Sequence, residues 1–234
     1  MQDKVILIVG ATGGIGSALA RQLAPTGAKL VLAARNEANL ATLAGELSGE
    51  VLTVSTDITQ PEQVNALIQA TLARFGQIDV LVNAAGMGIL KPYNSIEPAE
   101  LEQILDLNLK GCFYTTKAAA QEMQKRKSGH ICNVVGILGK HSMGMAAAYS
   151  ASKFGVVGFS KSMAEELKRF GVKFTLFYFG GVDSPFWDNV TLKVDRTKML
   201  SCKTAANAIF YALSAEPQAV PMEINIQPDS HLFF

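Results

Sequence analysis

The stretch VILIVGATGGIG occupies residues 5–16 and joins a short apolar run to a cluster of glycines. The run is rich in β-branched residues and predicts a strand at residues 5–9, and helical periodicity begins at Gly14. A glycine-rich loop can turn tightly and lets a phosphate group approach its backbone, and the free N–H groups of a helix N-terminus favour anions. The alternative is a glycine-rich turn that binds no ligand. The residues predicted to hold a pyrophosphate are Gly10, Thr12, Gly13, Gly14, Ile15 and Gly16.

Strands and helices alternate along the whole chain. Further β-branched apolar runs predict strands at residues 29–33, 51–55, 80–82, 130–135, 173–178 and 223–226. Helical periodicity predicts helices at residues 14–23, 37–47, 61–75, 98–124, 148–170 and 204–214. Because crossovers between parallel strands are right-handed, this order predicts an α/β fold, a doubly wound, mostly parallel seven-stranded sheet with helices on both faces. No repeat or linker interrupts the pattern, so residues 1–234 are expected to form a single domain.

The composition is that of a globular protein with small-molecule partners. Apolar residues make up 49% of the 234 residues and charged residues 18%, which excludes a disordered chain. Lys and Arg total 21 against 20 Asp and Glu, and no basic stripe occurs, so no nucleic-acid partner is expected. The longest clean apolar run, residues 5–10, is too short to span a bilayer, and the first residues do not resemble a signal peptide.

The cysteines give no sign of a metal site or a redox motif. Cys112, Cys132 and Cys202 are far apart in the sequence, whereas such motifs need close pairs. Buried free thiols are the simplest interpretation, and no metal is expected. Together with the missing membrane span, this pattern predicts a cytoplasmic location, which is a reducing compartment.

The residues after the second predicted strand bear on the dinucleotide that the chain binds. Ala34-Arg35-Asn36 contains no acidic side chain to accept a hydrogen bond from the ribose 2′-hydroxyl of NAD. The guanidinium of Arg35 could instead hold the 2′-phosphate of NADP through paired charge-assisted hydrogen bonds. Arg35 and Asn36 thus predict that NADP(H) is preferred over NAD(H). Alternatively, Arg35 only solvates the start of the next helix.

Tyr149 and Lys153 lie four residues apart, a spacing that places both on one face of a helix. A phenol with a pKa of about 10 is a poor base at neutral pH. A neighbouring ammonium stabilises the phenolate, so Lys153 is expected to lower the pKa of Tyr149 toward neutrality. Tyr149 could then exchange a proton with a carbonyl oxygen. On its own, such a pair is common and usually structural.

These motifs follow one another in the order typical of a known enzyme family. Gly10, Gly14 and Gly16 are followed by Asn83-Ala84-Ala85-Gly86, by Asn108 within Leu107-Asn108-Leu109-Lys110-Gly111, and by Tyr149 with Lys153. From Lys4 to about Ile226 the chain resembles the short-chain dehydrogenase/reductases. The resemblance implies a Rossmann fold, a nicotinamide cofactor and hydride transfer at a carbonyl or alcohol substrate. It also implies a homodimer or homotetramer.

The resemblance further implies a role for each matching residue. Tyr149 would give or take the proton, Lys153 would bind the nicotinamide ribose and tune Tyr149, and Asn108 would hold a proton-relay water. Without the family, Asn108 is interpreted as stabilising a kink in its helix through its amide, and both roles can coexist. The implied cofactor contacts are Asp57 and Ile58 near the adenine, Asn83, Ala84 and Gly86 at the end of the fourth strand, and Gly180, Val182 and Ser184 near the nicotinamide.

Three positions depart from the family pattern. The family usually has a catalytic Ser thirteen residues before the Tyr, where this chain has Gly136. Losing one preorganised donor typically costs ~10²–10³ in rate, so an impaired reductase is expected unless a water replaces the hydroxyl. Phe179 replaces the Pro of a Pro-Gly pair, and Val9 replaces a Thr before the first glycine. The chain is predicted to be an NADP(H)-dependent oxidoreductase; the alternative is an NADP(H)-binding regulatory or interaction subunit with little or no catalysis.

The predicted substrate side is apolar. Residues 185–187, Pro-Phe-Trp, and the loop on to Leu200 are expected to cover the site, and Met143 and Met145 are expected to add adaptable apolar surface. The alternative is that these side chains only pack the loop down. The terminal residues 231–234, His-Leu-Phe-Phe, are expected either to dock on a neighbouring subunit or to be disordered.

Overall fold

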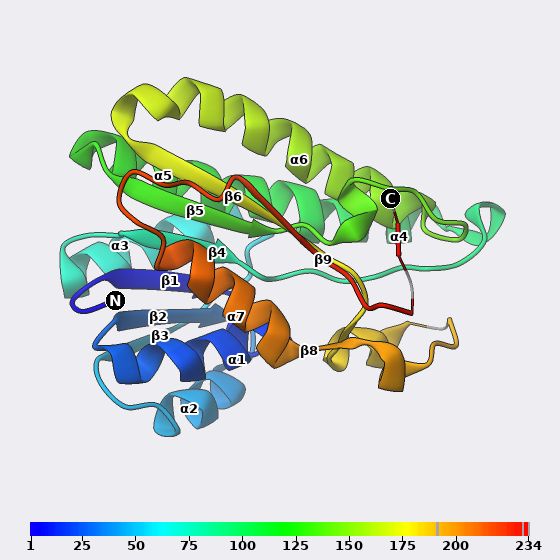
Figure 1. Ribbon diagram of the computed structural model, residues 1–234, viewed down its shortest axis with the longest axis horizontal. Coiled ribbons are helices and arrows are strands. Elements are labelled where there is room, and N and C mark those ends of the chain that lie inside the picture. The colour runs from blue at the N-terminus through cyan, green and yellow to red at the C-terminus, as the bar shows by residue number, and fades with distance from the viewer. Residues whose placement is uncertain (191, 231, 234) are drawn as a thin grey trace.

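The seven predicted strands form one parallel sheet in the computed structural model, which describes residues 1–190, 192–230, 232 and 233 (Figure 1). Their spatial order is β3-β2-β1-β4-β5-β6-β9, so the sheet extends in both directions from β1. Parallel pairing throughout confirms the predicted doubly wound α/β fold. The strands are β1 (Val5–Val9), β2 (Lys29–Ala34), β3 (Val51–Ser55), β4 (Val80–Asn83), β5 (Gly129–Val134), β6 (Val172–Phe179) and β9 (Glu223–Ile226), beside a separate parallel pair, β7 (Val182–Asp183) and β8 (Leu200–Ser201).

Helices cover both faces of the sheet (Figure 1). The α-helices are α1 (Gly14–Leu23), α2 (Glu37–Gly45), α3 (Pro61–Phe75), α4 (Pro98–Leu105), α5 (Cys112–Arg126), α6 (Ala147–Leu167) and α7 (Cys202–Leu213). Every residue of β1 is buried, because Ile6 and Ile8 pack in one core cluster with α1, α2 and α7, whereas Leu7 and Val9 pack in another with α3 and α5. The short turns are the 3-10 helices η1 (Ala24–Thr26), η2 (Tyr93–Ser95), η4 (Ile137–Gly139), η5 (Lys168–Phe170), η6 (Pro185–Asn189) and η7 (Arg196–Lys198).

The helix predicted at residues 98–124 is confirmed as one helical stretch, but its middle is π-helical. The π-helical segment η3 (Asp106–Gly111) separates α4 from α5, and Asn108 lies within it. A π-helical segment adds a residue to the turn without changing the apolar pattern on either side, so periodicity alone does not show it. The other predicted helices and strands agree with the structure to within three residues at each end.

The carboxyl ends of the strands face the loop of residues 184–200, which projects beyond the sheet (Figure 1). The C-terminal end of the chain lies on this same side (Figure 1). Sheets of this kind bind ligands at the carboxyl ends of their strands, near the point where the strand order reverses, which here falls between β1 and β4. The site is therefore expected at the carboxyl ends of β1 and β4.

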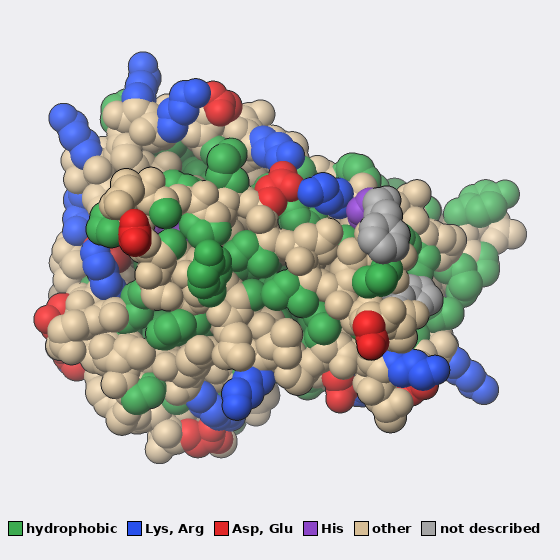
Figure 2. Space-filling model, viewed as in Figure 1, with side chains coloured by type: hydrophobic (Ala, Val, Ile, Leu, Met, Phe, Trp, Pro, Cys, Tyr) green, Lys and Arg blue, Asp and Glu red, His purple; other side chains and the backbone are tan. Residues whose placement is uncertain are grey.

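The surface carries charges of both signs. Figure 2 shows Lys and Arg side chains interspersed with Asp and Glu around the edge of one face, and hydrophobic side chains over its centre. Within the part of the chain that the structure describes, no helix has the length and the apolar character needed to cross a membrane.

Candidate active site

The glycine loop turns between β1 and α1 and meets the end of β4. Gly10 has a φ of +80°, and a Cβ atom there would lie 2.6 Å from the backbone nitrogen of Ala85. A Cβ atom at Gly16 would lie 2.3 Å from the carbonyl oxygen of Gly10. Backbone alone therefore forms this edge of the site. Gly13 precedes α1 without a side-chain cap, so the first N–H groups of this helix can bind an anion.

The structure brings Tyr149 and Lys153 together near the start of α6. The Lys153 ammonium nitrogen lies 5.7 Å from the centre of the Tyr149 ring and donates a hydrogen bond of 3.3 Å to the carbonyl oxygen of Val134. Lys153 is 5% exposed, whereas Tyr149 is half-buried. A charged group and a phenol thus share a largely desolvated corner at the end of β5.

Burial controls the ionisation of both groups. It raises the pKa of the Tyr149 phenol above its ordinary value and lowers the pKa of the Lys153 ammonium. The expected lowering of the Tyr149 pKa toward neutrality is therefore wrong for this structure, because burial of the phenol shifts its pKa in the other direction. At neutral pH Tyr149 is a neutral phenol, the form that can donate a proton.

Asn108 ties the loop after β4 to α6. Its side-chain nitrogen donates to the Met87 carbonyl oxygen at 2.9 Å and to the Ser152 hydroxyl at 3.1 Å, and its side-chain oxygen accepts from the Met87 N–H at 2.9 Å. Both amide hydrogens of a buried residue in a π-helical segment are thus paired, as the interpretation of a stabilised kink requires. A relay water at Asn108 stays a prediction. A Cβ atom at Gly86 would lie 3.3 Å from the Asn108 oxygen and 3.4 Å from the Lys153 nitrogen, so a glycine leaves room for both groups.

Asn83 joins strands and helices below the site. Its side-chain nitrogen donates to Thr116 at 3.0 Å and to the side-chain oxygen of Asn133 at 2.9 Å, and its oxygen accepts from the Thr115 hydroxyl at 2.8 Å. Asn133 continues the network to Ser160 at 2.8 Å. All of these residues are buried, so the network fixes β4 and β5 against α5 and α6 beneath the residues of the site.

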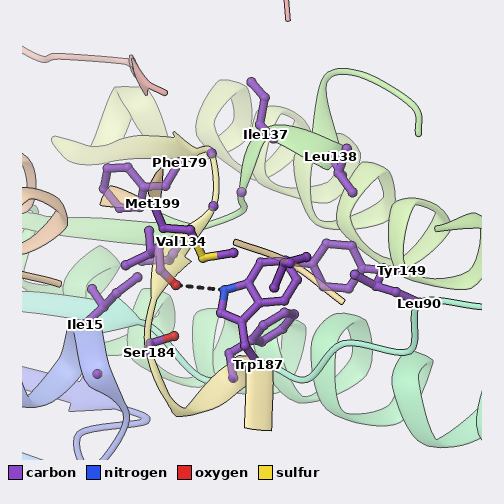
Figure 3. Close-up of a pocket in the computed structure, with 18 of the residues that line it drawn as sticks. Ile15, Leu90, Val134, Ile137, Leu138, Tyr149, Phe179, Ser184, Trp187 and Met199 are labelled. Carbon is purple, nitrogen blue, oxygen red and sulfur yellow. Dashed lines mark hydrogen bonds between the residues drawn. The ribbon is translucent and has the colours of Figure 1, made fainter. Parts of the chain in front are cut away.

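A cavity of about 660 Å³ lies between the glycine loop and the start of α6. Figure 3 shows Tyr149 on one side and Ile15 and Ser184 on the other, with Trp187 between them. The Trp187 indole N–H donates a hydrogen bond of 2.9 Å to the carbonyl oxygen of Val182, drawn as the dashed line in Figure 3. The predicted site residues that line this cavity are Gly13, Gly14, Ile15, Ala84, Gly86, Tyr149, Lys153, Gly180, Val182 and Ser184.

The other predicted site residues lie away from the cavity wall. Arg35 and Asn36 are exposed just beyond the end of β2, and the Asn36 side chain caps α2 by accepting from the Asn39 N–H at 2.9 Å. The Asp57 carboxylate accepts from the N–H and the hydroxyl of Thr59 at 3.0 and 2.8 Å. Cofactor contacts at these positions stay predictions. The remaining predicted residues outside the wall are Gly10, Thr12, Gly16, Ile58, Asn83 and Asn108.

Gly136 lies directly against the Tyr149 hydroxyl. A Cβ atom at Gly136 would lie 3.3 Å from the Tyr149 hydroxyl oxygen and 3.8 Å from the Phe179 carbonyl oxygen. The backbone has a φ of +85°, and its N–H donates to the Phe177 carbonyl oxygen at 3.0 Å. A small side chain at this position would require the Tyr149 hydroxyl to shift by a few tenths of an ångström, and it would have a backbone conformation that L residues avoid.

Comparison with known proteins identifies the family. Residues 4–195 match the family model described as short chain dehydrogenase. The chain belongs to the short-chain dehydrogenase family. An uncharacterized oxidoreductase of Staphylococcus aureus (strain USA300) is 35% identical over 231 residues, which cover 97% of this chain and 98% of that protein. The family and these relatives support an oxidoreductase.

Solved structures of short-chain dehydrogenases superpose over nearly the whole chain. An alcohol dehydrogenase from the archaeon Thermococcus sibiricus, complexed with 5-hydroxy-NADP, gives a TM-score of 0.92 at 26% identity and covers 99% of both chains. A 3-ketoacyl-(acyl-carrier-protein) reductase from Brucella melitensis, complexed with NADH, gives a TM-score of 0.90 at 25% identity and covers 97% of this chain and 98% of that one. Similar chains therefore bind either dinucleotide.

The apolar wall of this short-chain dehydrogenase differs in part from the expected one. Met143, Phe186 and Trp187 line the cavity as expected, but Met145 is 40% exposed and lies outside it. Phe186 also packs edge-on against Tyr149, with ring centres 5.8 Å apart.

Several lining residues were missed in the sequence. Leu90, Ile137 and Leu138 carry no motif, and only their long-range packing brings them to the cavity. The C-terminal segment was expected to dock on another subunit or to be disordered, and this is wrong for Phe233, which lines the cavity of its own chain. His231 and Phe234 lie outside the described residues.

Proposed function

We propose that this short-chain dehydrogenase is an NADP(H)-dependent oxidoreductase that interconverts a carbonyl compound and an alcohol, with Tyr149 as proton donor and acceptor. The observation that carries this proposal is the shared cavity of Tyr149, Lys153 and the uncapped start of α1 at Gly13 and Gly14. A group that exchanges protons with oxygen thus opens into the same space as backbone suited to a pyrophosphate. The relatives complexed with 5-hydroxy-NADP and with NADH support a nicotinamide cofactor.

The residues of the cavity fit such a dinucleotide. Side chains are excluded at Gly10 and Gly16, where a Cβ would meet backbone atoms, so the loop presents N–H groups to a phosphate. When bound, NADP(H) would supply or accept the hydride. The residues that would hold it are Gly13, Gly14 and Ile15 at the pyrophosphate, Arg35 at the 2′-phosphate, Asp57 and Ile58 at the adenine, Lys153 at the ribose, and Val182 and Ser184 at the nicotinamide.

Tyr149 would supply the proton. In the reduction, its phenol donates to the carbonyl oxygen of the substrate, and the Lys153 ammonium stabilises the phenolate that remains. The oxidation needs Tyr149 to be deprotonated, which alkaline pH favours, and the phenolate then takes the proton of the alcohol. Apolar side chains around Tyr149, among them Leu90 and Phe186, exclude water and strengthen the attraction between phenolate and ammonium.

The preference for NADP(H) rests on Arg35. It is exposed just beyond the end of β2, and no acidic side chain in the described part of the chain pairs with it. The test is a titration with NADPH and with NADH, followed by energy transfer from Trp187, the one tryptophan of the chain, to the reduced nicotinamide. We expect Arg35→Ser to weaken NADPH binding by about tenfold or more and to leave NADH binding unchanged. Arg74→Ser, which removes an exposed arginine outside the cavity, should change neither, and equal losses in both variants would contradict the assignment.

The role of Tyr149 is tested by Tyr149→Phe, which removes only the hydroxyl. We expect kcat to fall by ~10²–10⁴ with NADPH affinity unchanged, because the ring and its packing remain. The measurement is NADPH oxidation with a panel of ketones. Turnover of the unaltered enzyme no greater than that of the variant would contradict the catalytic role.

A second candidate function is NADP(H) binding with little or no catalysis, in a regulatory or interaction subunit. Two observations favour it: Gly136 places no hydroxyl beside Tyr149, and Phe179 replaces a proline next to the nicotinamide end of the cavity. Tight NADPH binding without turnover above that of Tyr149→Phe would select this function. Turnover well above that level would exclude it.

The assembly and location belong to the same proposal. We expect a homodimer or homotetramer in the cytoplasm, built of one dinucleotide-binding domain per chain. Strands from Val5 to Ile226 share one sheet, which supports the single domain, and the free thiols of Cys112, Cys132 and Cys202 are compatible with a reducing compartment. Light scattering that shows a monomer at micromolar concentration would contradict the assembly.

A further inference from the structure

The segment after β9 folds back onto the molecule and is fixed there by Gln227. The Gln227 side-chain oxygen accepts from the backbone N–H of Phe233 at 2.7 Å, and its side-chain nitrogen donates to the carbonyl oxygen of Phe233 at 2.9 Å. One amide thus pairs with both backbone groups of one residue, which sets the position of that residue relative to the end of β9. Phe233 is therefore held by specific contacts rather than left in solvent.

Two further contacts join this segment to the rim of the cavity. The Pro228 ring is buried against Gly180 at the end of β6, where a Cβ atom at Gly180 would lie 2.5 Å from the Pro228 Cδ. The Ser230 hydroxyl donates to the carbonyl oxygen of Lys198 at 3.3 Å, in the loop that covers the site. Pro228, Ser230 and Phe233 all line the cavity. The segment therefore closes the cavity between β6 and the covering loop.

The Phe233 ring completes an apolar wall near Tyr149. It stacks on the His141 ring with centres 5.6 Å apart and an interplanar angle of 24°. It also packs against a buried apolar cluster with Tyr149 at its edge. The members of that cluster that line the cavity with Phe233 are Leu90, Val135, Ile137, Leu138, Met143, Trp187 and Leu192.

We propose that Phe233 is a specificity-determining residue of the substrate cavity, and that the C-terminal segment selects apolar carbonyl compounds long enough to reach this ring from Tyr149. The inference deepens the proposed function and rests on it. The aliphatic and aromatic side chains around Phe233 stabilise apolar groups by removing them from water, whereas the charged lining residues Lys193, Asp195 and Lys198 belong to the covering loop. Under this proposal, the reaction of a ketone too short to span the cavity from Tyr149 to Phe233 does not depend on this ring.

The test compares Phe233→Ala with Leu232→Ala, using NADPH with methyl nonyl ketone and with butanone. Leu232 precedes Phe233 on the same segment, is 51% exposed and is not part of the wall. We expect Phe233→Ala to raise KM for methyl nonyl ketone by about tenfold, with kcat nearly retained and with the KM for butanone unchanged. Leu232→Ala should change none of these values. The same KM for methyl nonyl ketone in both variants would overturn the proposal.

A second pair of measurements separates this inference from the proposed function. Gln227→Leu removes both hydrogen bonds to Phe233 and should reproduce the KM change of Phe233→Ala, while NADPH binding stays normal. If the unaltered protein binds NADPH but turns over neither ketone, the proposed function fails, and the wall is then tested by binding alone. Methyl nonyl ketone should then quench the fluorescence of Trp187 with a Kd about tenfold higher in Phe233→Ala than in Leu232→Ala. Equal Kd values would overturn the inference.

Discussion

Two loops at the carboxyl end of the sheet have a glycine of nearly the same backbone angle near their start, Gly10 directly after β1 at φ +80° and Gly136 two residues after the end of β5 at φ +85°. Their surroundings differ. A Cβ atom at Gly10 would meet the backbone of Ala85 at 2.6 Å, whereas at Gly136 the nearest atom is the Tyr149 hydroxyl oxygen at 3.3 Å. At Gly10, therefore, both the space and the angle require glycine, while at Gly136 only the angle does.

The difference teaches what each glycine contributes. Gly10 belongs to a part of the cavity where backbone meets backbone, so any side chain moves β1 relative to the end of β4. Gly136 lies where backbone meets a reactive side chain, so a substitution there changes the surroundings of the Tyr149 hydroxyl before it changes the fold. The part of the site at Gly10 is thus determined by backbone packing, and the part at Gly136 by the side chains that surround one phenol.

The largest effect is expected for Gly10→Ala. The added methyl group would push on backbone atoms that cannot rotate away, so the free energy of unfolding should fall by about 3 kcal/mol and NADPH binding should be lost. The matched control is Gly76→Ala, because Gly76 has a φ of +73° and no atom within 4 Å of its Cβ position. That variant should lose only about 1 kcal/mol, the cost of the angle alone. If urea unfolding shows the same loss of unfolding free energy in Gly10→Ala and Gly76→Ala, the close contact with Ala85 does not set Gly10 apart.

A moderate effect is expected for Gly136→Ser, which puts a hydroxyl beside Tyr149. The angle should cost about 1–2 kcal/mol of stability, as for any L residue with a positive φ. The new donor should raise kcat by several tens-fold, toward the ~10²–10³ that one preorganised donor contributes. Gly136→Ala carries the same strain without the hydroxyl, so it should lose similar stability and gain no rate. Identical kcat values for the Ser and Ala variants would show that the missing hydroxyl does not limit the reaction.

The sequence predicted the strand, the glycine loop and the helix at the start of the chain well because their determinants are local. A strand, a glycine loop and a helix follow one another within residues 5–23, and each needs only its own residues to form. Tyr149 and Lys153 were also predictable, since four residues on one helix fix their relation. The family pattern then located Gly136 beside the phenol, and the structure places it there.

The part of the cavity around Phe233 could not be predicted because its contacts are long-range. Phe233 reaches the cavity through the packing of Pro228 on Gly180 and the pairing of Gln227 with the Phe233 backbone. No local pattern distinguishes such a phenylalanine from a disordered terminal one. The direction of the Tyr149 pKa was wrong for a related reason, since helical spacing gives the distance to Lys153 but not the loss of solvent around both groups.

The smallest expected effect is a pH dependence of stability. It distinguishes β1, which precedes Gly10, from β5, which precedes Gly136. All five residues of β1 are apolar, whereas β5 contains His130, whose Nε2 lies 2.8 Å from the Thr175 hydroxyl. Burial, with a smaller contribution from Lys173, lowers the pKa of His130 to about 4. The unfolded chain, with a pKa of about 6.5 at this residue, binds the proton more readily than the folded protein does, so acid favours unfolding.

The stability that His130 contributes is therefore fully present above about pH 7 and is lost as the pH falls from about 7 toward 4. Between pH 7 and about 5.5 the loss should be about 1 kcal/mol, in a range where most carboxylates remain charged. The measurement is urea unfolding at both pH values for the unaltered protein and for His130→Gln, which keeps a hydrogen-bonding side chain that does not titrate. The unaltered protein should have a higher free energy of unfolding than His130→Gln at pH 7, and this advantage should be about 1 kcal/mol smaller at pH 5.5. If the free energies of unfolding of the two proteins change equally with pH, His130 takes up no proton on unfolding. In that case β5 does not differ from β1 in its response to pH.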